Sequence, residues 1–215
     1  IEKLSKKASH IFVGSNHLYD YFKKFNSNIS ILPTVIDFEK YSNVKVKKFN
    51  KISIVWIGTP STKKYLSSII PSLIELKKEF DLNLIVIGAK FKNKNIKNYK
   101  WSENTEVRIL KKCHIGIMPL DNSIWSKSKC SFKIIQYLAS GLAAVASDIG
   151  QNSYILNNDN GLLISKKELW YDKLKKLVLD VDYRSRLSLN GIKIIENKYN
   201  YNINTKNLIR ILKIL

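Results

Sequence analysis

Cysteine and long apolar runs are the scarcest features of this 215-residue sequence. Its two cysteines, Cys113 and Cys130, cannot form a disulfide framework, and no cysteine or histidine cluster has zinc spacing. The three histidines, His10, His17 and His114, are scattered, so we expect structural or surface roles for them. No apolar stretch approaches the ~20 residues that a membrane-spanning helix needs. The low cysteine count, the scattered histidines and the short apolar runs therefore exclude a disulfide-stapled scaffold, a zinc module and a membrane-spanning segment. They favour a reducing, cytoplasmic setting.

Acidic side chains and arginine are also few. There are 17 acidic and 37 basic residues, a formal net charge of +20, and only four of the basic residues are arginine. Lysine is accompanied by abundant asparagine and isoleucine, the combination that AT-rich codons produce. Proteins that read nucleic acid usually place arginine at base edges within a recognisable module, and none is visible here. We therefore expect no nucleic-acid partner. Our hypothesis for the charge is peripheral contact with anionic lipid at the inner face of the cytoplasmic membrane, where each nearby lysine contributes ~1 kcal/mol.

Short apolar runs alternate with amphipathic stretches along the chain. The runs predict strands at 52–57, 84–87, 115–118, 143–146 and 162–164. A helix is predicted from about 103 to 111, and the clearest helices are those at 167–179, 183–197 and 204–215. Pro71 is expected to interrupt or restart the helix that follows the first strand. The lysine-rich stretch 90–100 is predicted to be a solvated loop. This alternation predicts a doubly wound α/β fold, whose ligands bind beyond the carboxyl ends of the strands.

The segment 127–148 is the most informative part of the sequence. An amphipathic helix is predicted from four apolar residues at helical spacing, Phe132, Ile135, Leu138 and Ala139. Ser131 is the predicted N-cap, Gly141 the stop, and 142–146 a buried strand. Lys129 and Lys133 flank the helix start, where free N–H groups and the helix dipole suit a phosphate or diphosphate. The segment therefore predicts a nucleotide-diphosphate site; an ordinary surface helix with solvated lysines is the alternative.

Three motifs resemble the C-terminal, donor-binding domain of retaining GT-B glycosyltransferases of family 4, the glycosyl transferases group 1. They are Gly-Ile-Met-Pro-Leu at 116–120, Lys-Cys-Ser-Phe-Lys-Ile-Ile-Gln-Tyr-Leu-Ala-Ser-Gly at 129–141 and Val-Ala-Ser-Asp-Ile-Gly at 145–150. Weaker similarity extends to 55–62 and 31–37, in the order of the family. The resemblance implies a Rossmann-like doubly wound parallel sheet, the C-terminal half of a GT-B fold. It also implies transfer of a sugar from a nucleotide diphosphate, with retention and with no metal or other cofactor.

The resemblance implies a domain organisation as well. Residues 1–40 correspond to a remnant of the acceptor-side domain, with a strand at 10–13, a helix from 16 to about 25 and a strand near 29–32. An interdomain linker at 41–51 and the nucleotide-sugar domain at 52–200 follow. Residues 201–215 form a C-terminal helix that packs back on the N-terminal domain. Because the chain begins with Ile1 and not with Met, we expect a fragment that is inactive alone; a naturally shortened protein is the alternative.

The candidate site residues follow from the same resemblance. Lys133 and Lys129 are implied as the catalytic cations, which neutralise the diphosphate and the negative charge that grows as the sugar leaves. The implied donor-binding residues are Gly58, Thr59, Trp101, Leu120, Cys130, Ser131, Phe132 and Gln136. Among them, the residues at 130–132 present backbone N–H groups, the turn at 58–59 lets the backbone approach the phosphates, and Trp101 lies near the base.

The sequence departs from the family at two positions that usually hold glutamates, here Ser128 and Gln136. Gln136 can still hydrogen-bond ribose. The usual Arg and Lys after the first strand are also missing, and Lys63 and Lys64 are the nearest cations. Two functions therefore stay open. The first is a glycosyltransferase that uses a nucleotide sugar and an acceptor glycan or lipid-linked saccharide. The second is a non-catalytic binding or scaffold protein built on a degenerate glycosyltransferase domain.

Overall fold

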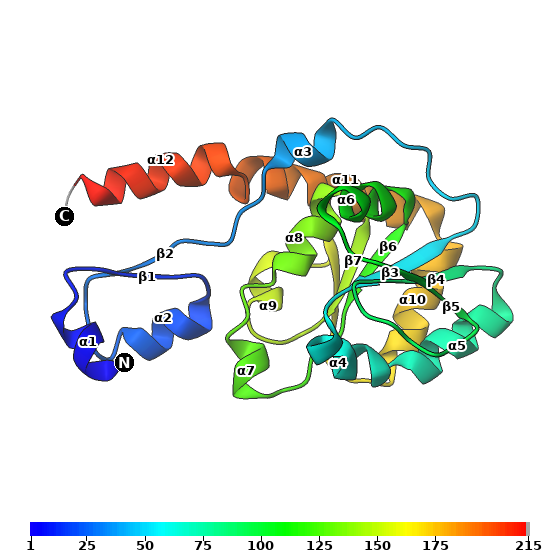
Figure 1. Cartoon of the computed structure of the whole chain (residues 1–215), viewed down its shortest axis with the longest axis horizontal. Helices are drawn as coiled ribbons and strands as arrows, with labels where there is room; N and C mark the ends of the chain where they lie inside the picture. The colour runs from blue at the N-terminus through cyan, green and yellow to red at the C-terminus, as the bar shows by residue number, and fades with distance from the viewer. Residues whose placement is uncertain (214–215) are drawn as a thin grey trace.

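A six-stranded, wholly parallel sheet forms the centre of the computed structural model, which describes residues 1–213 (Figure 1). The order of its strands is β5-β4-β3-β6-β7-β8. Their bounds are β3 Ser53–Ile57, β4 Asn83–Ile87, β5 Ile96–Tyr99, β6 Ile115–Met118, β7 Ala143–Ser147 and β8 Gly161–Ile164. The chain reverses its direction of winding between β3 and β6. The carboxyl ends of these two strands are therefore the switch point at which such sheets bind ligands.

Helices cover both faces of this sheet, as expected for a doubly wound fold. One face packs against α6 (Glu103–Lys112), α8 (Phe132–Ala139) and the C-terminal part of α11 (Val181–Lys198). The other packs against α4 (Lys63–Ser67), α5 (Ile70–Glu79) and α10 (Leu169–Leu179). Side chains of β3 alternate between the two cores, with Val55 in the first and Trp56 in the second. The predicted Rossmann-like α/β fold is thus confirmed.

The first 42 residues contain α1 (Glu2–Lys7), β1 (Ile11–Val13), α2 (Asn16–Phe22), β2 (Ile29–Ile31) and α3 (Phe38–Ser42), and β1 pairs with β2 in parallel. The part from α1 to β2 lies beside the carboxyl ends of the sheet strands (Figure 1), whereas Tyr41 of α3 is buried in the core on the α8 face. The last helix, α12 (Tyr201–Leu212), lies near β2, since residues of both line the same grooves. The N-terminus and the end of α12 lie on the left of Figure 1. The predicted end of the last helix at Leu215 lies outside the described residues.

Local differences from the prediction have clear causes. Residues 96–99, predicted as loop, form the edge strand β5, in which only Ile96 is buried. The predicted helix end near Phe25 is too late, because α2 ends at Phe22 and a turn follows. Pro71 does restart the helix, in the first turn of α5. Ile124–Lys127 and Asn152–Ile155 form two short helices, α7 and α9, that the sequence analysis did not include.

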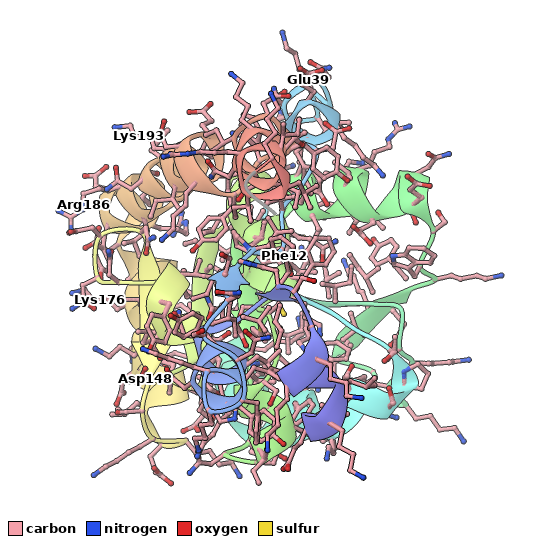
Figure 2. All side chains as sticks on the ribbon, turned by 90° about the vertical axis from the view of Figure 1, so that its left-hand side faces the viewer. Phe12, Glu39, Asp148, Lys176, Arg186 and Lys193 are labelled. Atoms are coloured by element: carbon pink, nitrogen blue, oxygen red, sulfur yellow. The ribbon has the colours of Figure 1, made fainter. Side chains whose placement is uncertain are left out.

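Basic side chains extend outward over much of the surface. Figure 2 shows Lys176, Arg186 and Lys193 projecting along one side, from α10 and α11. Arg184 is an exception: it is buried and donates hydrogen bonds from Nη1 to the carbonyl oxygens of Leu177 and Val178. One of the four arginines therefore supports the helix packing and is not available at the surface.

Candidate functional site

A cavity of about 700 Å³ opens at the carboxyl ends of β3 and β6, where the fold predicts a ligand. It is lined by residues at or after the ends of β3, β4 and β6, by α6 and the loop before it, and by the start of α8. The lining residues are Ile57, Gly58, Thr59, Thr62, Gly88, Trp101, Glu106, Met118, Lys129, Cys130, Ser131, Phe132, Lys133 and Gln136. All the predicted site residues except Leu120 are therefore brought together here. Its volume is in the range of cavities that hold small molecules and cofactors.

The N-terminus of α8 presents unused backbone donors to this cavity. Within residues 1–213, the backbone N–H groups of Cys130, Ser131, Phe132 and Lys133 donate no hydrogen bond to the protein. Ser131 takes a left-handed conformation with φ of 58°, and its hydroxyl donates to Asn152 Oδ1 at 2.6 Å. Ser131 is the N-cap residue of α8, as predicted, but its side chain makes no capping hydrogen bond to the helix. The consequence is that the donors stay free for an anion.

Tyr137 fixes the position of α8 against the sheet. Its fully buried hydroxyl accepts a hydrogen bond from the Ile57 N–H and donates one to the Ile117 carbonyl oxygen, both at 3.1 Å. Gly116 makes this possible, since a Cβ there would lie 2.3 Å from Tyr137 Cγ. One side chain thus ties the helix that bears the free N–H groups to both strands of the switch point.

The two predicted cations have different surroundings. Burial of Lys133 lowers its pKa to about 8, and the positive charge of nearby Lys129 acts in the same direction. Lys129 Nζ lies 5.2 Å from the ring centre of Trp125 and 5.7 Å from that of Tyr65. Among the described ion pairs, neither lysine has a carboxylate partner. Both positive charges are therefore available to an anion in the cavity.

Glu106 of α6 is the charged residue of the cavity that the sequence does not indicate. Its carboxylate accepts hydrogen bonds from Gln136 Nε2, from Trp101 Nε1 and, at 3.3 Å, from the Tyr41 hydroxyl. Trp101 is half-exposed beside it. Because Glu106 and Gln136 lie thirty positions apart and on different helices, no sequence spacing indicates this contact.

The turn after β3 lines the cavity with backbone whose N–H groups are already bonded within the protein. The Gly58 N–H donates to the Ile87 carbonyl oxygen at 2.9 Å, and the Thr59 N–H donates to Thr62 Oγ1 at 3.1 Å. These two residues line the cavity, but their N–H groups already have partners within the fold. They shape the wall of the site and are not free phosphate donors.

Leu120 lies outside the main cavity. Together with Lys64, Asp121 and Lys166 it lines a separate cavity of about 320 Å³ on the side of β7 and β8. Its backbone N–H and carbonyl both bond to Ser147 Oγ, at 2.9 and 3.2 Å. Its side chain packs against the core on the α8 face, but it does not line the main cavity with the other predicted site residues.

The N-terminal unit borders the site through Gly14. A Cβ at this position would lie 2.5 Å from Cys130 Sγ, so the loop after β1 touches the loop before α8. Two residues further on, the backbone N–H of Asn16 donates to Gln151 Oε1 at 3.0 Å. Cys130 is thus placed where the two parts of the chain meet.

Solved structures share this fold over the whole chain. The chain superposes on Anabaena Alr3699/HepE in complex with UDP and glucose with a TM-score of 0.82 at 12% identity, covering 99% of this chain and 65% of that one. Its TM-score with sucrose-phosphate synthase from Thermosynechococcus elongatus is 0.76 at 10% identity, covering 99% of this chain and 59% of that one. With the pneumococcal O-GlcNAc transferase GtfA in complex with UDP and GlcNAc the TM-score is 0.75 at 14% identity, covering 99% of this chain and 46% of that one. The parallel sheet and its helices are therefore those of the C-terminal domain of GT-B glycosyltransferases.

The sequence identifies the family. The model of glycosyl transferases group 1 matches residues 51–180, more than half of the chain. The chain therefore belongs to the glycosyl transferases group 1 family. No curated protein sequence matches it. It spans less than two thirds of the length of the three structures compared above.

Over 1–213, no three His, Cys, Asp or Glu side chains cluster in a way that could hold a metal ion. In the same part of the chain, no helix is long and apolar enough to cross a membrane.

Proposed function

We propose that this chain is the donor-binding half of a retaining glycosyltransferase of family 4, and that the main cavity binds the nucleoside diphosphate of a nucleotide sugar. The observation that carries this proposal is the start of α8. There, four backbone N–H groups without a partner in the described chain and two lysines without a carboxylate converge on one cavity. An isolated surface helix with solvated lysines would not line a cavity of this size.

The proposed chemistry is electrostatic. As the bond between the sugar and the diphosphate breaks, negative charge grows on the leaving phosphate. Free N–H groups at a helix start and two ammonium groups stabilise that charge more than they stabilise the bound ground state. We propose that Lys133, Lys129 and these N–H groups balance the charge with no metal or other cofactor. The acceptor, a glycan or lipid-linked saccharide, would bind on the side of the N-terminal unit, where Gly14 meets Cys130.

Calorimetric titration of the purified chain with UDP, GDP and ADP tests this proposal. We expect micromolar to low-millimolar binding of one nucleotide, unchanged by EDTA and weakened in Gln136→Ala. We also propose that the chain alone binds donor without transferring the sugar. Binding of none of the three nucleotides would contradict the donor-site proposal and favour a scaffold protein on a degenerate domain, which the Ser128 and Gln136 departures also suggest.

Nucleotide affinity should depend on pH above neutrality. The pKa of Lys133 is about 8 in the free protein, and a bound diphosphate will raise it by favouring the charged form. Below pH 8 the amine is already protonated. Above it, binding must take up a proton, so affinity should fall by up to tenfold per pH unit.

Titrations at pH 7.0, 8.0 and 9.0 measure this dependence, and Lys133→Arg is the matched control. An arginine keeps its charge throughout this range, so its profile should be flat. An equal decline in both proteins would assign the pH dependence to another group.

We also propose peripheral contact with anionic lipid at the inner face of the cytoplasmic membrane. Besides the net charge of +20, α7 supports this, because Ile124 and Trp125 are 77% and 72% exposed beside Lys127 and Lys129. Tryptophan and lysine together suit a headgroup region. In co-sedimentation with phosphatidylglycerol vesicles at low salt, the double variant Ile124→Ser, Trp125→Ser should lose most of the bound fraction, whereas Leu189→Ser on α11 should not. Equal binding of all three proteins would remove α7 from the proposal.

A further inference from the structure

Glu106 is a carboxylate inside a cavity whose other charged groups are cations. It is half-buried, and none of the ion pairs of residues 1–213 includes it. Its three partners, Trp101, Gln136 and Tyr41, are all neutral donors. A carboxylate has about four acceptor positions on its two oxygens. Glu106 therefore keeps both its charge and acceptor capacity for a ligand.

Gln136 has a fixed orientation because of this contact. A carboxylate can only accept, so the amide nitrogen of Gln136 must face Glu106, and the same nitrogen lies 3.5 Å from the Tyr41 hydroxyl. Oε1 of Gln136 accepts no hydrogen bond from any described residue. Among the described residues, every buried side-chain oxygen has a hydrogen-bond partner, so an oxygen without one, such as this Oε1, is accessible. Oε1 is therefore open to the cavity. Glu106 and Gln136 together present acceptors and no donor.

The cationic and the anionic parts of the cavity lie at different levels along the axis of α8. Lys133 lies in the first turn of the helix, and Gln136 lies one turn further on, about 4.5 Å along the axis. An anionic group is attracted to the first turn and repelled by Glu106. A neutral group that donates two adjacent hydrogen bonds fits the second position. The vicinal hydroxyls of a ribose have this chemistry.

We propose that Glu106 is a specificity-determining residue of this site. With Gln136 Oε1 it accepts hydrogen bonds from the 2′- and 3′-hydroxyls of the ribose, and its charge keeps the diphosphate at the start of α8. The carboxylate that position 136 lacks is thus supplied from α6. This inference rests on the proposed function and names the group that reads the ribose.

Three ligands test it by calorimetry: the tightest of UDP, GDP and ADP, its 2′-deoxy analogue, and inorganic pyrophosphate. The native protein should bind the deoxy analogue about tenfold more weakly, since it loses a hydrogen bond to a charged acceptor. In Glu106→Gln and Glu106→Ala, affinity for the ribonucleotide should fall about tenfold and the preference over the deoxy analogue should nearly vanish. Affinity for pyrophosphate should stay equal or increase, because a repulsive charge has been removed.

Glu103→Gln is the matched control. Glu103 lies on the same helix, but it is exposed, pairs with Lys40 and does not line the cavity, so its variant should behave like the native protein in all three titrations. A parallel loss for all three ligands in both Glu106 variants would indicate a purely structural role and overturn the inference. So would equal native affinity for the ribonucleotide and its deoxy analogue. If the native protein binds no nucleotide, the proposed function fails and this inference fails with it.

Discussion

Lys133→Ala should lower nucleoside diphosphate affinity about 100-fold, the largest functional effect that we expect from a single substitution. Lys133 lines the cavity at the first turn of α8 and has no carboxylate partner among the described ion pairs. Its charge is therefore not neutralised before the ligand arrives. A charge-assisted hydrogen bond in a half-buried site is worth roughly 1.5–3 kcal/mol, which is a factor of ten to more than one hundred in affinity. Titration with the tightest-binding nucleotide measures the change.

Lys127→Ala provides the comparison for this substitution. Lys127 lies on α7, six positions earlier in the chain, and does not line the cavity. The Lys127→Ala variant loses one positive charge from the same region as Lys133→Ala. If only general electrostatic attraction is lost, its affinity for the nucleotide should stay within about twofold of the native value. Similar losses in the two variants would mean that net charge, and not the position of Lys133, governs binding.

Gly116→Ala should have the largest effect on stability, about 3 kcal/mol in the free energy of unfolding. A Cβ at position 116 would lie 2.3 Å from Cγ of the fully buried Tyr137 ring. That ring cannot move without breaking the hydrogen bonds of its hydroxyl to Ile57 and Ile117. Denaturant unfolding measures the loss, and nucleotide affinity should fall as well, because α8 loses its anchor.

Gly191→Ala is the control with a comparable approach distance. There the new Cβ would lie 2.6 Å from Leu138 Cδ2, the end of a flexible side chain. The rotamer of Leu138 can adjust, and alanine is the better helix former by up to ~1 kcal/mol. We expect a change within about 1 kcal/mol in either direction. If both variants lose the same stability, the rigidity of the Tyr137 ring does not explain the Gly116 effect.

The elements that could be predicted from sequence are those with a buried face. Strand β7 was recognised because its five residues are all buried and apolar or small, and α8 because its apolar side chains recur at helical spacing. Edge strand β5 was missed for the opposite reason. Its Lys97 and Asn98 are exposed, so the sequence of this strand has the same polar pattern as a solvated loop.

The cations and the helix start of the candidate site could be predicted from the sequence, but the contacts between residues far apart in the chain could not. Lys133 and Gln136 belong to one continuous motif, and the structure brings them into one cavity. Glu106 reaches Gln136 only when α6 packs on the same sheet face, which no local pattern encodes. Leu120 follows β6 as the sequence predicts, but it lines a different cavity, and its bond to Ser147 of the neighbouring strand is not visible in the sequence.

A crystal structure of the chain with the tightest-binding of UDP, GDP and ADP tests the central claim most directly. We predict the diphosphate at the N–H groups of residues 130–133 beside Lys133, the ribose hydroxyls at Glu106 and Gln136, and the base near Trp101. A nucleotide bound instead in the smaller cavity beside Leu120 and Lys166, with the main cavity empty, would contradict the account.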